Sequence, residues 1–430
     1  MRVNETEIKK TYFIGIGGIG MSGLAQLLKD QGVEVTGSDR EATPVTELLE
    51  KKGIHVSFAQ DGTAVSRDVQ IAVYSEAVWD DNPDRMTCKE LGIPQLSYFE
   101  MLGEISKEKC TIAIAGTNGK TTTTGMLAKI LADAGASPTA VVGSIVKDFG
   151  SNYLSGTSDL FVVEACEYKR DFLSLSPTYL IITNIEWDHT DYYKDLVDVQ
   201  DAFRTLIQKV PANGAIITDS THPNIAPLLK NLSCPVVNYK TDMPYTLRLP
   251  GDFNQMNAQA AAAGARTVQK TITEDSIATS LSHFHGTWRR FEYKGKTKKG
   301  ADVYDDYAHH PTAILVTLAE MRKKTKGRVI VAFHPHLYTR TRDLLADFAV
   351  AFKDADEVFI APIYAAREVD DGTISSTMLA ELITKNGIPT QALSFEEIEQ
   401  RLQVAKEGDV VVTMGAGDIY RIADTLVKDS

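Results

Sequence analysis

The sequence predicts an α/β protein of three domains, each built on a mostly parallel sheet. Three times along the 430 residues, apolar strands run into a glycine-rich or polar turn and then into a helical pattern. The strands predicted at 160–164 and 179–184 are almost continuously apolar, as is typical of parallel strands covered on both faces. The length favours two to four domains, and the three repeats favour three.

The composition is that of an ordinary globular chain, with 43% hydrophobic and 24% charged residues. A net charge of −12 argues against a nucleic-acid partner. The N-terminus has no apolar signal region and no stretch approaches 18 apolar residues, so we expect no membrane partner and a cytoplasmic location. The cysteines form no CxxC pair, which argues against a disulfide framework or a zinc site; they are Cys88, Cys110, Cys166 and Cys234.

The first repeat has the spacing of a nucleotide-binding βαβ unit. A strand at 12–16 precedes GGIG at 17–20 and a helical pattern at 21–28, and a second strand at 33–39 ends in Asp39. This is the Rossmann-like arrangement, in which a glycine turn approaches a diphosphate and the acid accepts a hydrogen bond from the ribose or the base edge. Because a lone glycine motif is weak, it alone leaves a nicotinamide-dependent oxidoreductase open.

The second repeat contains the strongest motif, AGTNGKTTTT at 115–124, between a strand at 111–114 and a helical pattern at 125–131. A strand, a glycine-rich turn and a helix N-terminus place N–H groups around an anion, which we expect to be a nucleotide polyphosphate. Lys120 is predicted to reach the terminal phosphates, and a hydroxyl of Thr121 or Thr122 to ligate Mg²⁺. The loop is shorter than the usual P-loop, because only two residues separate its glycines. Its predicted nucleotide-binding residues are Gly116, Thr117, Asn118, Gly119, Lys120, Thr121 and Thr122.

Polar residues follow the two apolar strands of the second repeat. Glu164 ends the first strand, and the segment 184–189 follows the second. Since ligands of open α/β sheets lie at the carboxyl ends of the strands, Glu164 and His189 are predicted to converge on the phosphate turn as Mg²⁺ ligands. The alternative is a capping role for Glu164 and a core hydrogen bond for His189.

The third repeat has predicted strands at 301–305, 328–333, 357–361 and 409–413, each ending in a polar cluster. Its histidines show no convincing zinc-ligand spacing, so substrate binding is the better prediction. Arg340 stands at a strand-to-helix turn, where we expect it to bind substrate.

Eight motifs, in this order, resemble the Mur ligases over essentially the whole chain. They are AGTNGKTTTT, VVEACEYKRDF, TNIEWDHTDYY, GDFNQMNAQAA, WRRFE, YDDYAHHPT, FHPHLYTRT and GAGDI. The resemblance implies an ATP-dependent ligase of cytoplasmic peptidoglycan synthesis that passes through an acyl phosphate. Within the family, the opening GIGGIGMSGLA and the last two histidine-rich motifs point to the joining of L-alanine to the lactyl carboxylate of UDP-N-acetylmuramate.

The resemblance also implies roles for individual residues. Two Mg²⁺ ions, for which Mn²⁺ could substitute, are expected, one held by Thr121 and Glu164 and the other by His189. The remaining expected ATP contacts are Asn254, Asn257, Arg290 and Asp306. The UDP-sugar is expected at Gly17, Gly18, Ile19, Gly20, Asp39 and Ser75, and L-alanine at His309, His310, His336 and Arg340. Lys120, His189, Arg290, His309 and Arg340 are the predicted catalytic residues.

The expected domains are 1–107 for the UDP-sugar, 108–285 for ATP in a P-loop-type fold, and 286–430, Rossmann-like, for the amino acid. A monomer or weak homodimer is expected. Asn118 and Leu337 replace residues common in the family, and the segment before Gly251 is short. Leu337 leaves open a related ligase that attaches a preformed peptide to the same sugar acid. A catalytically silent scaffold with this fold is the remaining alternative.

Overall fold

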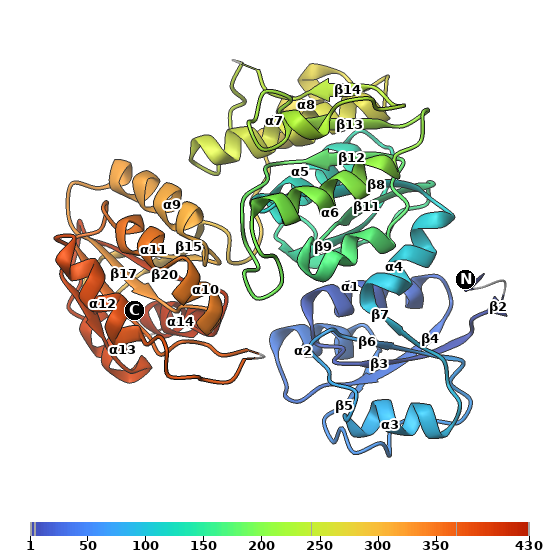
Figure 1. The fold of residues 1–430 in the computed structure, drawn as a ribbon, viewed down its shortest axis with the longest axis horizontal. Helices are drawn as coiled ribbons and strands as arrows, with labels where there is room; N and C mark the ends of the chain where they lie inside the picture. The colour runs from blue at the N-terminus through green and yellow to red at the C-terminus, as the bar shows by residue number, and fades with distance from the viewer. Residues whose placement is uncertain (1, 4–5, 242, 367, 429–430) are drawn as a thin grey trace. The chain divides into compact units, whose positions relative to one another are not determined.

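The computed structural model confirms the predicted α/β architecture with three mostly parallel sheets (Figure 1). It describes residues 1–430 except 1, 4–5, 242, 367 and 429–430. A two-stranded antiparallel pair, β1 (Arg2–Val3) and β2 (Thr6–Glu7), precedes the first sheet. No helix among the described residues is long and apolar enough to cross a bilayer.

The N-terminal sheet has five parallel strands in the order β5-β4-β3-β6-β7. The strands are β3 (Lys10–Ile14), β4 (Glu34–Ser38), β5 (His55–Ser57), β6 (Ile71–Tyr74) and β7 (Gln95–Ser97). The helices are α1 (Ile19–Asp30), α2 (Pro44–Lys51), α3 (Pro83–Glu90) and α4 (Tyr98–Lys107). Local sequence determines several helix starts. At α4, the Ser97 hydroxyl accepts the Glu100 N–H and the Glu100 carboxylate accepts the Ser97 N–H, which together form a capping box.

The central sheet has seven strands in the order β10-β9-β11-β8-β12-β13-β14. Its strands are β8 (Cys110–Ala115), β9 (Thr139–Val146), β10 (Ser151–Leu154), β11 (Leu160–Glu164), β12 (Tyr179–Ile182), β13 (Ala215–Thr218) and β14 (Val236–Asn238). Its helical elements are α5 (Lys120–Asp133), η1 (Tyr168–Ser174), α6 (Leu196–Gln208), η2 (Ala226–Leu228), α7 (Asp252–Val268) and α8 (Glu274–Ser282). Only β10 is antiparallel to its neighbour, so β9 and β10 form a hairpin at the edge of the sheet.

The C-terminal sheet has the order β15-β16-β20-β17-β18-β19, and only β15 is antiparallel. Its strands are β15 (Glu292–Lys296), β16 (Asp302–Asp306), β17 (Val329–Phe333), β18 (Glu357–Ile360), β19 (Thr390–Ala392) and β20 (Val410–Met414). The helices are α9 (Pro311–Lys324), α10 (Tyr338–Asp343), α11 (Leu345–Ala351), α12 (Ser376–Lys385), α13 (Phe395–Leu402) and α14 (Tyr420–Lys428). Every residue of β17 and β20 is buried, as their apolar sequences require.

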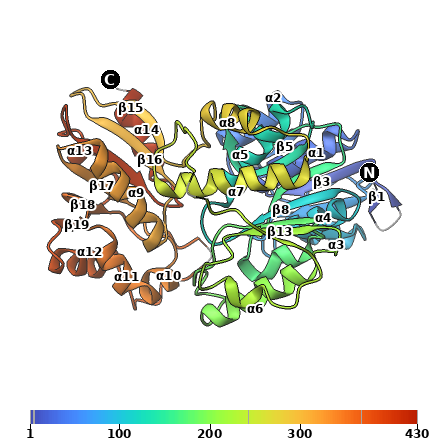
Figure 2. The same ribbon diagram turned by 90° about the horizontal axis from the view of Figure 1, so that it is seen from above.

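The chain folds into two compact bodies. The first contains 1–186, 197–248 and 255–285, and so carries both the N-terminal and the central sheet. In it, the helices α7 and α8 lie near α5 (Figure 2). The second contains 187–196, 249–254 and 286–430. Trp187 and Phe253 pack against its hydrophobic core, so two short segments from the middle of the sequence belong to the C-terminal body.

A buried polar network joins α1 to the β9–β10 hairpin inside the first body. The Asn152 side chain donates to the Ile19 carbonyl and to the Ser22 hydroxyl, 3.0 Å away. Gln26 donates to the Asn152 amide oxygen at 3.1 Å and accepts from the Ser151 hydroxyl at 3.0 Å. Gly23 permits this approach, because a Cβ there would lie 3.0 Å from the Asn152 amide nitrogen. The network therefore fixes the start of α1 against the central sheet.

Removing the Asn152 side chain should destabilise the first body. Asn152→Ala leaves the part-buried Ile19 carbonyl and the buried Gln26 amide without their partner, at a cost of about 1–3 kcal/mol. This corresponds to a drop of roughly 2–12 °C in the melting temperature of a body of this size. Scanning calorimetry would measure it, with Gln31→Ala, an exposed change just beyond α1, as the matched control. Equal melting temperatures for the two variants would contradict the structural role of the network.

Candidate functional site

The phosphate turn lies where predicted, between β8 and α5. Gly116 and Gly119 both have positive φ values, +135° and +83°. A Cβ on Gly116 would collide with the Thr183 hydroxyl, and one on Gly119 with the Asn257 side chain. α5 begins directly after Gly119, which has no side chain to cap the helix, so the positive end of the helix dipole faces the turn.

Lys120 is held in place by an acid that the sequence analysis did not select. Its ammonium nitrogen lies 2.9 Å from the Glu167 carboxylate and also donates to the carbonyls of Gly116 and Thr117. Burial alone would lower the pKa of Lys120. The neighbouring acidic groups, Glu167 foremost, together have the larger effect, so the pKa of the lysine is raised. Glu167 itself is 2% exposed. Lys120 is therefore a charged, pre-positioned cation at the turn.

Thr121 and Glu164 provide oxygen ligands that suit Mg²⁺. The Thr121 hydroxyl lies 3.1 Å from one Glu164 oxygen, and the other oxygen accepts the Gly143 N–H of β9. Hydroxyl and carboxylate oxygens are the donors that this hard cation prefers, so the pair fits the ion predicted here. Asn257 is close to the same turn, where it accepts from the Thr123 hydroxyl at 3.3 Å.

The predicted UDP-sugar loop lies at the start of α1. The Gly17 N–H donates to the Asp39 carboxylate at 2.7 Å, and a Cβ on Gly17 would lie 2.8 Å from the same oxygen. Asp39 therefore braces the glycine loop, a role that the sequence did not suggest. Ser75 adjoins the loop, because a Cβ on Gly15 would be 3.1 Å from the Ser75 Cβ. Gly18 and Ile19 form the N-terminus of α1.

The second body contains the other predicted residues, beginning with a fully buried arginine. Arg340 is 1% exposed, and it donates to Asp188 at 2.8 Å and to the His336 ring at 3.0 Å. Burial opposes ionisation of Asp188, yet Arg340, ahead of the nearby histidines, holds the pKa of that carboxyl well below its usual range. The cation predicted to bind an amino-acid carboxylate is thus already engaged with a carboxylate of the chain.

Three of the four histidines of YDDYAHHPT and FHPHLYTRT, namely His309, His310 and His336, gather around this pair. His309 and His336 rings are 6.0 Å apart, and burial, with Arg340 next, lowers the pKa of His309 well below its usual range. His309 is therefore neutral, and its Nδ1 lies 2.8 Å from the Tyr307 carbonyl. This contact assigns the proton to Nδ1 and leaves Nε2 as an acceptor. His310 lies 3.3 Å from the Trp187 carbonyl and caps α9.

Arg290 and Asp306 lie beside a second buried arginine. Arg290 packs over the Tyr307 ring at 4.7 Å. Its neighbour Arg289 donates to the Asp305 carboxylate at 2.9 Å and to the carbonyls of Gly415 and Gly417. Arg289 thereby ties the segment containing Arg290 to the loop after β20. The sequence analysis quoted Arg289 within WRRFE but gave it no role.

His189 and Asn254, both predicted to bind the ATP complex, belong to the second body. His189 has a positive φ of +52°, and its carbonyl accepts from the N–H groups of Tyr192 and Tyr193. The Asn254 side chain donates to the Pro250 carbonyl at 2.7 Å. Their roles toward ATP stay predictions.

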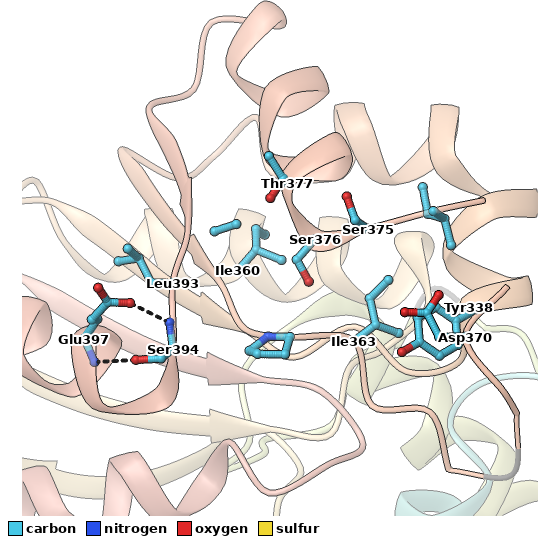
Figure 3. A pocket seen from close by; sticks show the side chains of 13 residues that line it. Tyr338, Ile360, Ile363, Asp370, Ser375, Ser376, Thr377, Leu393, Ser394 and Glu397 are labelled. Carbon is cyan, nitrogen blue, oxygen red and sulfur yellow. Dashed lines mark hydrogen bonds between the residues drawn. The ribbon is translucent and has the colours of Figure 1, made fainter. Parts of the chain in front are cut away.

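A cavity of about 400 Å³ opens elsewhere in the second body, at the carboxyl ends of β18 and β19 (Figure 3). Its hydroxyl groups are largely used by the fold. Ser394 and Glu397 each bond the other's N–H, as the dashed lines show, and Ser375 accepts from the Met378 N–H. The cavity contains none of the predicted site residues, and it adds no group to them.

The fold and these residues define a class: a three-domain α/β enzyme with a glycine turn before a helix in its central domain, a Rossmann-like glycine loop and a cation-rich C-terminal sheet edge. The chain belongs to the Mur ligase family. Its residues 10–109 match the catalytic domain of the family, 114–246 the middle domain, and 289–417 the glutamate ligase domain.

The chain is similar to several individual members. It is 38% identical to the UDP-N-acetylmuramate–L-alanine ligase of Clostridium kluyveri, with 97% of each chain covered, and 40% identical to that of Lachnospira eligens, at the same coverage. Among solved structures, the UDP-N-acetylmuramate-alanine ligase of Thermotoga maritima is 27% identical with a TM-score of 0.81, covering 97% of this chain and 98% of that one. A murein peptide ligase from Psychrobacter arcticus shares the fold, with a TM-score of 0.75 at 24% identity, covering 98% of each chain.

Breaking the buried ion pair should destabilise the second body strongly. Asp188→Asn leaves the Arg340 guanidinium buried without a counter-charge, at a cost of about 3–5 kcal/mol. Replacing both partners, as Asp188→Asn with Arg340→Met, should cost less than the single change because no charge is then buried. Calorimetric melting temperatures of the three proteins give the comparison. A double variant less stable than Asp188→Asn would count against the pair.

Asp306 should make stability fall as the pH rises. Burial raises its pKa from 3.8 to about 6, while the Thr317 hydroxyl donates to it at 2.8 Å. The folded state therefore keeps a proton that the unfolded chain loses. This stabilisation is complete below pH 4 and is lost as the pH passes 6, about 1–3 kcal/mol in all. Asp306→Asn should remove this part of the pH dependence of melting between pH 4 and 7, whereas the exposed Asp347→Asn should keep it. If wild type and Asp306→Asn showed the same dependence of melting temperature on pH, the raised pKa of Asp306 would not be its cause.

Proposed function

We propose that this chain is an ATP-dependent ligase that joins L-alanine to the lactyl carboxylate of UDP-N-acetylmuramate, in cytoplasmic peptidoglycan precursor synthesis. The observation that carries the proposal is the similarity to L-alanine ligases over 97% of the chain, at 38–40% identity. The charged residues described above are of the kinds that such a reaction requires.

A carboxylate is a poor acylating agent, so the reaction begins by transfer of the ATP γ-phosphoryl group to the lactyl carboxylate. The amine of L-alanine then attacks the acyl phosphate through a tetrahedral intermediate, and phosphate leaves. Such chemistry depends on positioning and neutralising anions rather than on a nucleophilic side chain. Mg²⁺, when bound, would neutralise phosphate charge and orient the attack.

In the first body, the residues of this chain suit the binding and positioning of ATP. The N-terminus of α5 at Gly119 would bind phosphate oxygens, since the N–H groups of Thr117 and Asn118 already donate to Asn184. Lys120 would exchange its contact with Glu167 for the terminal phosphate. Thr121 and Glu164 would hold the ion, and Asn257, beside the turn, would contact the nucleotide. The loop at Gly17–Gly20, braced by Asp39, would bind the diphosphate of the sugar nucleotide.

In the second body, the residues suit an amino acid and the phosphate that is transferred. His189 would ligate a second ion, Arg290 would neutralise the γ-phosphate, Asn254 would contact the adenine, and Asp306 would bind the ribose. Arg340, with His336 and His310 nearby, would bind the alanine carboxylate. The neutral His309 could accept a hydrogen bond from the amine at Nε2. Expected domain limits at 107 and 285, and a monomeric or weakly dimeric state, are part of the proposal.

Phosphate release should require UDP-N-acetylmuramate, Mg²⁺ and an amino acid together, with L-alanine the best of the amino acids. A panel of L-alanine, glycine, L-serine and the tripeptide L-alanyl-γ-D-glutamyl-meso-diaminopimelate, assayed by phosphate release, tests this. A preference for the tripeptide would contradict the proposal. It would favour the alternative that Leu337 leaves open, a ligase that attaches a preformed peptide to the same sugar acid.

Lys120→Ala should abolish phosphate release, a loss of at least about 100-fold, because the terminal phosphate loses its positioned cation. Binding of UDP-N-acetylmuramate, measured by calorimetry without ATP, should be unchanged. Lys230→Ala, an exposed lysine of the central domain, is the control and should keep full activity. Loss of sugar-nucleotide binding in Lys120→Ala would contradict the separation of the two sites.

A further inference from the structure

Tyr98 lies beside the predicted UDP-sugar loop of the first body and has no role in the reaction described so far. It is the first residue of α4, the helix that connects the N-terminal sheet to β8. Both ends of the helix are anchored. Ser97 and Glu100 form the capping box at its start, and the Ser106 hydroxyl accepts the Ser176 N–H at 2.9 Å near its end. The position of the Tyr98 ring is thus set by rigid elements.

The Tyr98 ring lies against the glycine loop. A Cβ on Gly20 would lie 2.7 Å from the ring carbon that carries the hydroxyl and 2.9 Å from the hydroxyl oxygen. Gly20 therefore has to be glycine, because the phenol occupies the space that any side chain would need. The hydroxyl oxygen lies beside the N-terminus of α1, where the diphosphate of the sugar nucleotide is proposed to bind.

The hydroxyl is a neutral proton donor. Burial raises the pKa of Tyr98, and the neighbouring Glu164 carboxylate and Cys166 thiol raise it further. The phenol therefore remains a proton donor at neutral pH. Among the described residues no partner accepts a hydrogen bond from it, although the ring also packs edge-on against Phe99, with centroids 4.7 Å apart.

We propose that Tyr98 is a substrate-binding residue whose hydroxyl donates a hydrogen bond to an anionic oxygen of the sugar-nucleotide acid, beside Gly20. This inference rests on the proposed function, since it takes UDP-N-acetylmuramate as the substrate of that loop. A neutral donor suits this position, because it can bind an anion without competing with Lys120 and Mg²⁺ for the phosphates of ATP. The anionic oxygen belongs either to the diphosphate or to the lactyl carboxylate, and the two sources can be separated.

The test is Tyr98→Phe, which keeps the ring against Gly20 and removes only the hydroxyl. Tyr153→Phe is the matched control: its hydroxyl bonds Asp30 at 3.1 Å where β10 meets α1. We expect Tyr98→Phe to weaken UDP-N-acetylmuramate binding, measured by calorimetry, roughly 10- to 100-fold, the range for a hydrogen bond to a charged acceptor. The KM for UDP-N-acetylmuramate should rise accordingly, while the KM values for ATP and L-alanine and the melting temperature stay unchanged.

A second probe, UDP-N-acetylglucosamine, lacks the lactyl group and identifies the oxygen. Weakened binding of UDP-N-acetylmuramate alone assigns the carboxylate, and weakened binding of both nucleotides assigns the diphosphate. Unchanged affinity for UDP-N-acetylmuramate in Tyr98→Phe, or an equal loss in Tyr153→Phe, overturns the proposal. Failure of the wild-type protein to bind UDP-N-acetylmuramate would instead refute the proposed function.

Discussion

The turn between β8 and α5 constrains the rest of the first body. Gly116 and Gly119 need positive φ values, and side chains from two other elements fill the space beside them: Thr183 after β12 and Asn257 on α7. The turn can therefore keep its shape only if the central sheet and α7 are in place. The phosphate binding proposed for this turn and the start of α5 would therefore depend on the packing of the whole central domain rather than on a flexible loop.

Three cations are paired with buried acids, one in the first body and two in the second. Lys120 pairs with Glu167, Arg340 with Asp188, and Arg289 with Asp305. These pairs keep the side chains ordered and charged in a protein whose net charge is −12. Under the proposed function, anionic substrates would have to compete with carboxylates of the chain at Lys120 and Arg340, so binding would exchange one anion for another and need not bury an unpaired charge.

The parallel strands that the sequence predicted lie within one or two residues of the observed ones, because continuous apolar runs between polar turns have few other interpretations. The short parallel strands β5, β7, β13, β14 and β19 were not predicted. The sequence did not predict the β9–β10 hairpin or the contacts of Asn152 with α1, since a polar residue more than 120 positions away in sequence leaves no periodic signal.

The phosphate turn was predictable from local spacing. Glu167 and Asp188 were not selected, although both stand within quoted motifs, because their partners Lys120 and Arg340 come from other elements. Tyr98 was missed for the same reason: only the fold brings it to Gly20.

The segment 187–196 has a practical consequence for anyone who wishes to study the C-terminal sheet in isolation. Asp188 is the counter-ion of the fully buried Arg340, and Trp187 packs on the same core, yet both precede α6 in the sequence. A recombinant fragment that begins at 286 would lack both residues. It would leave the Arg340 guanidinium without its counter-ion in an apolar interior. Fragment screening or spectroscopy of that half would need a tethered copy of the ten-residue segment, or Arg340→Met to relieve the charge.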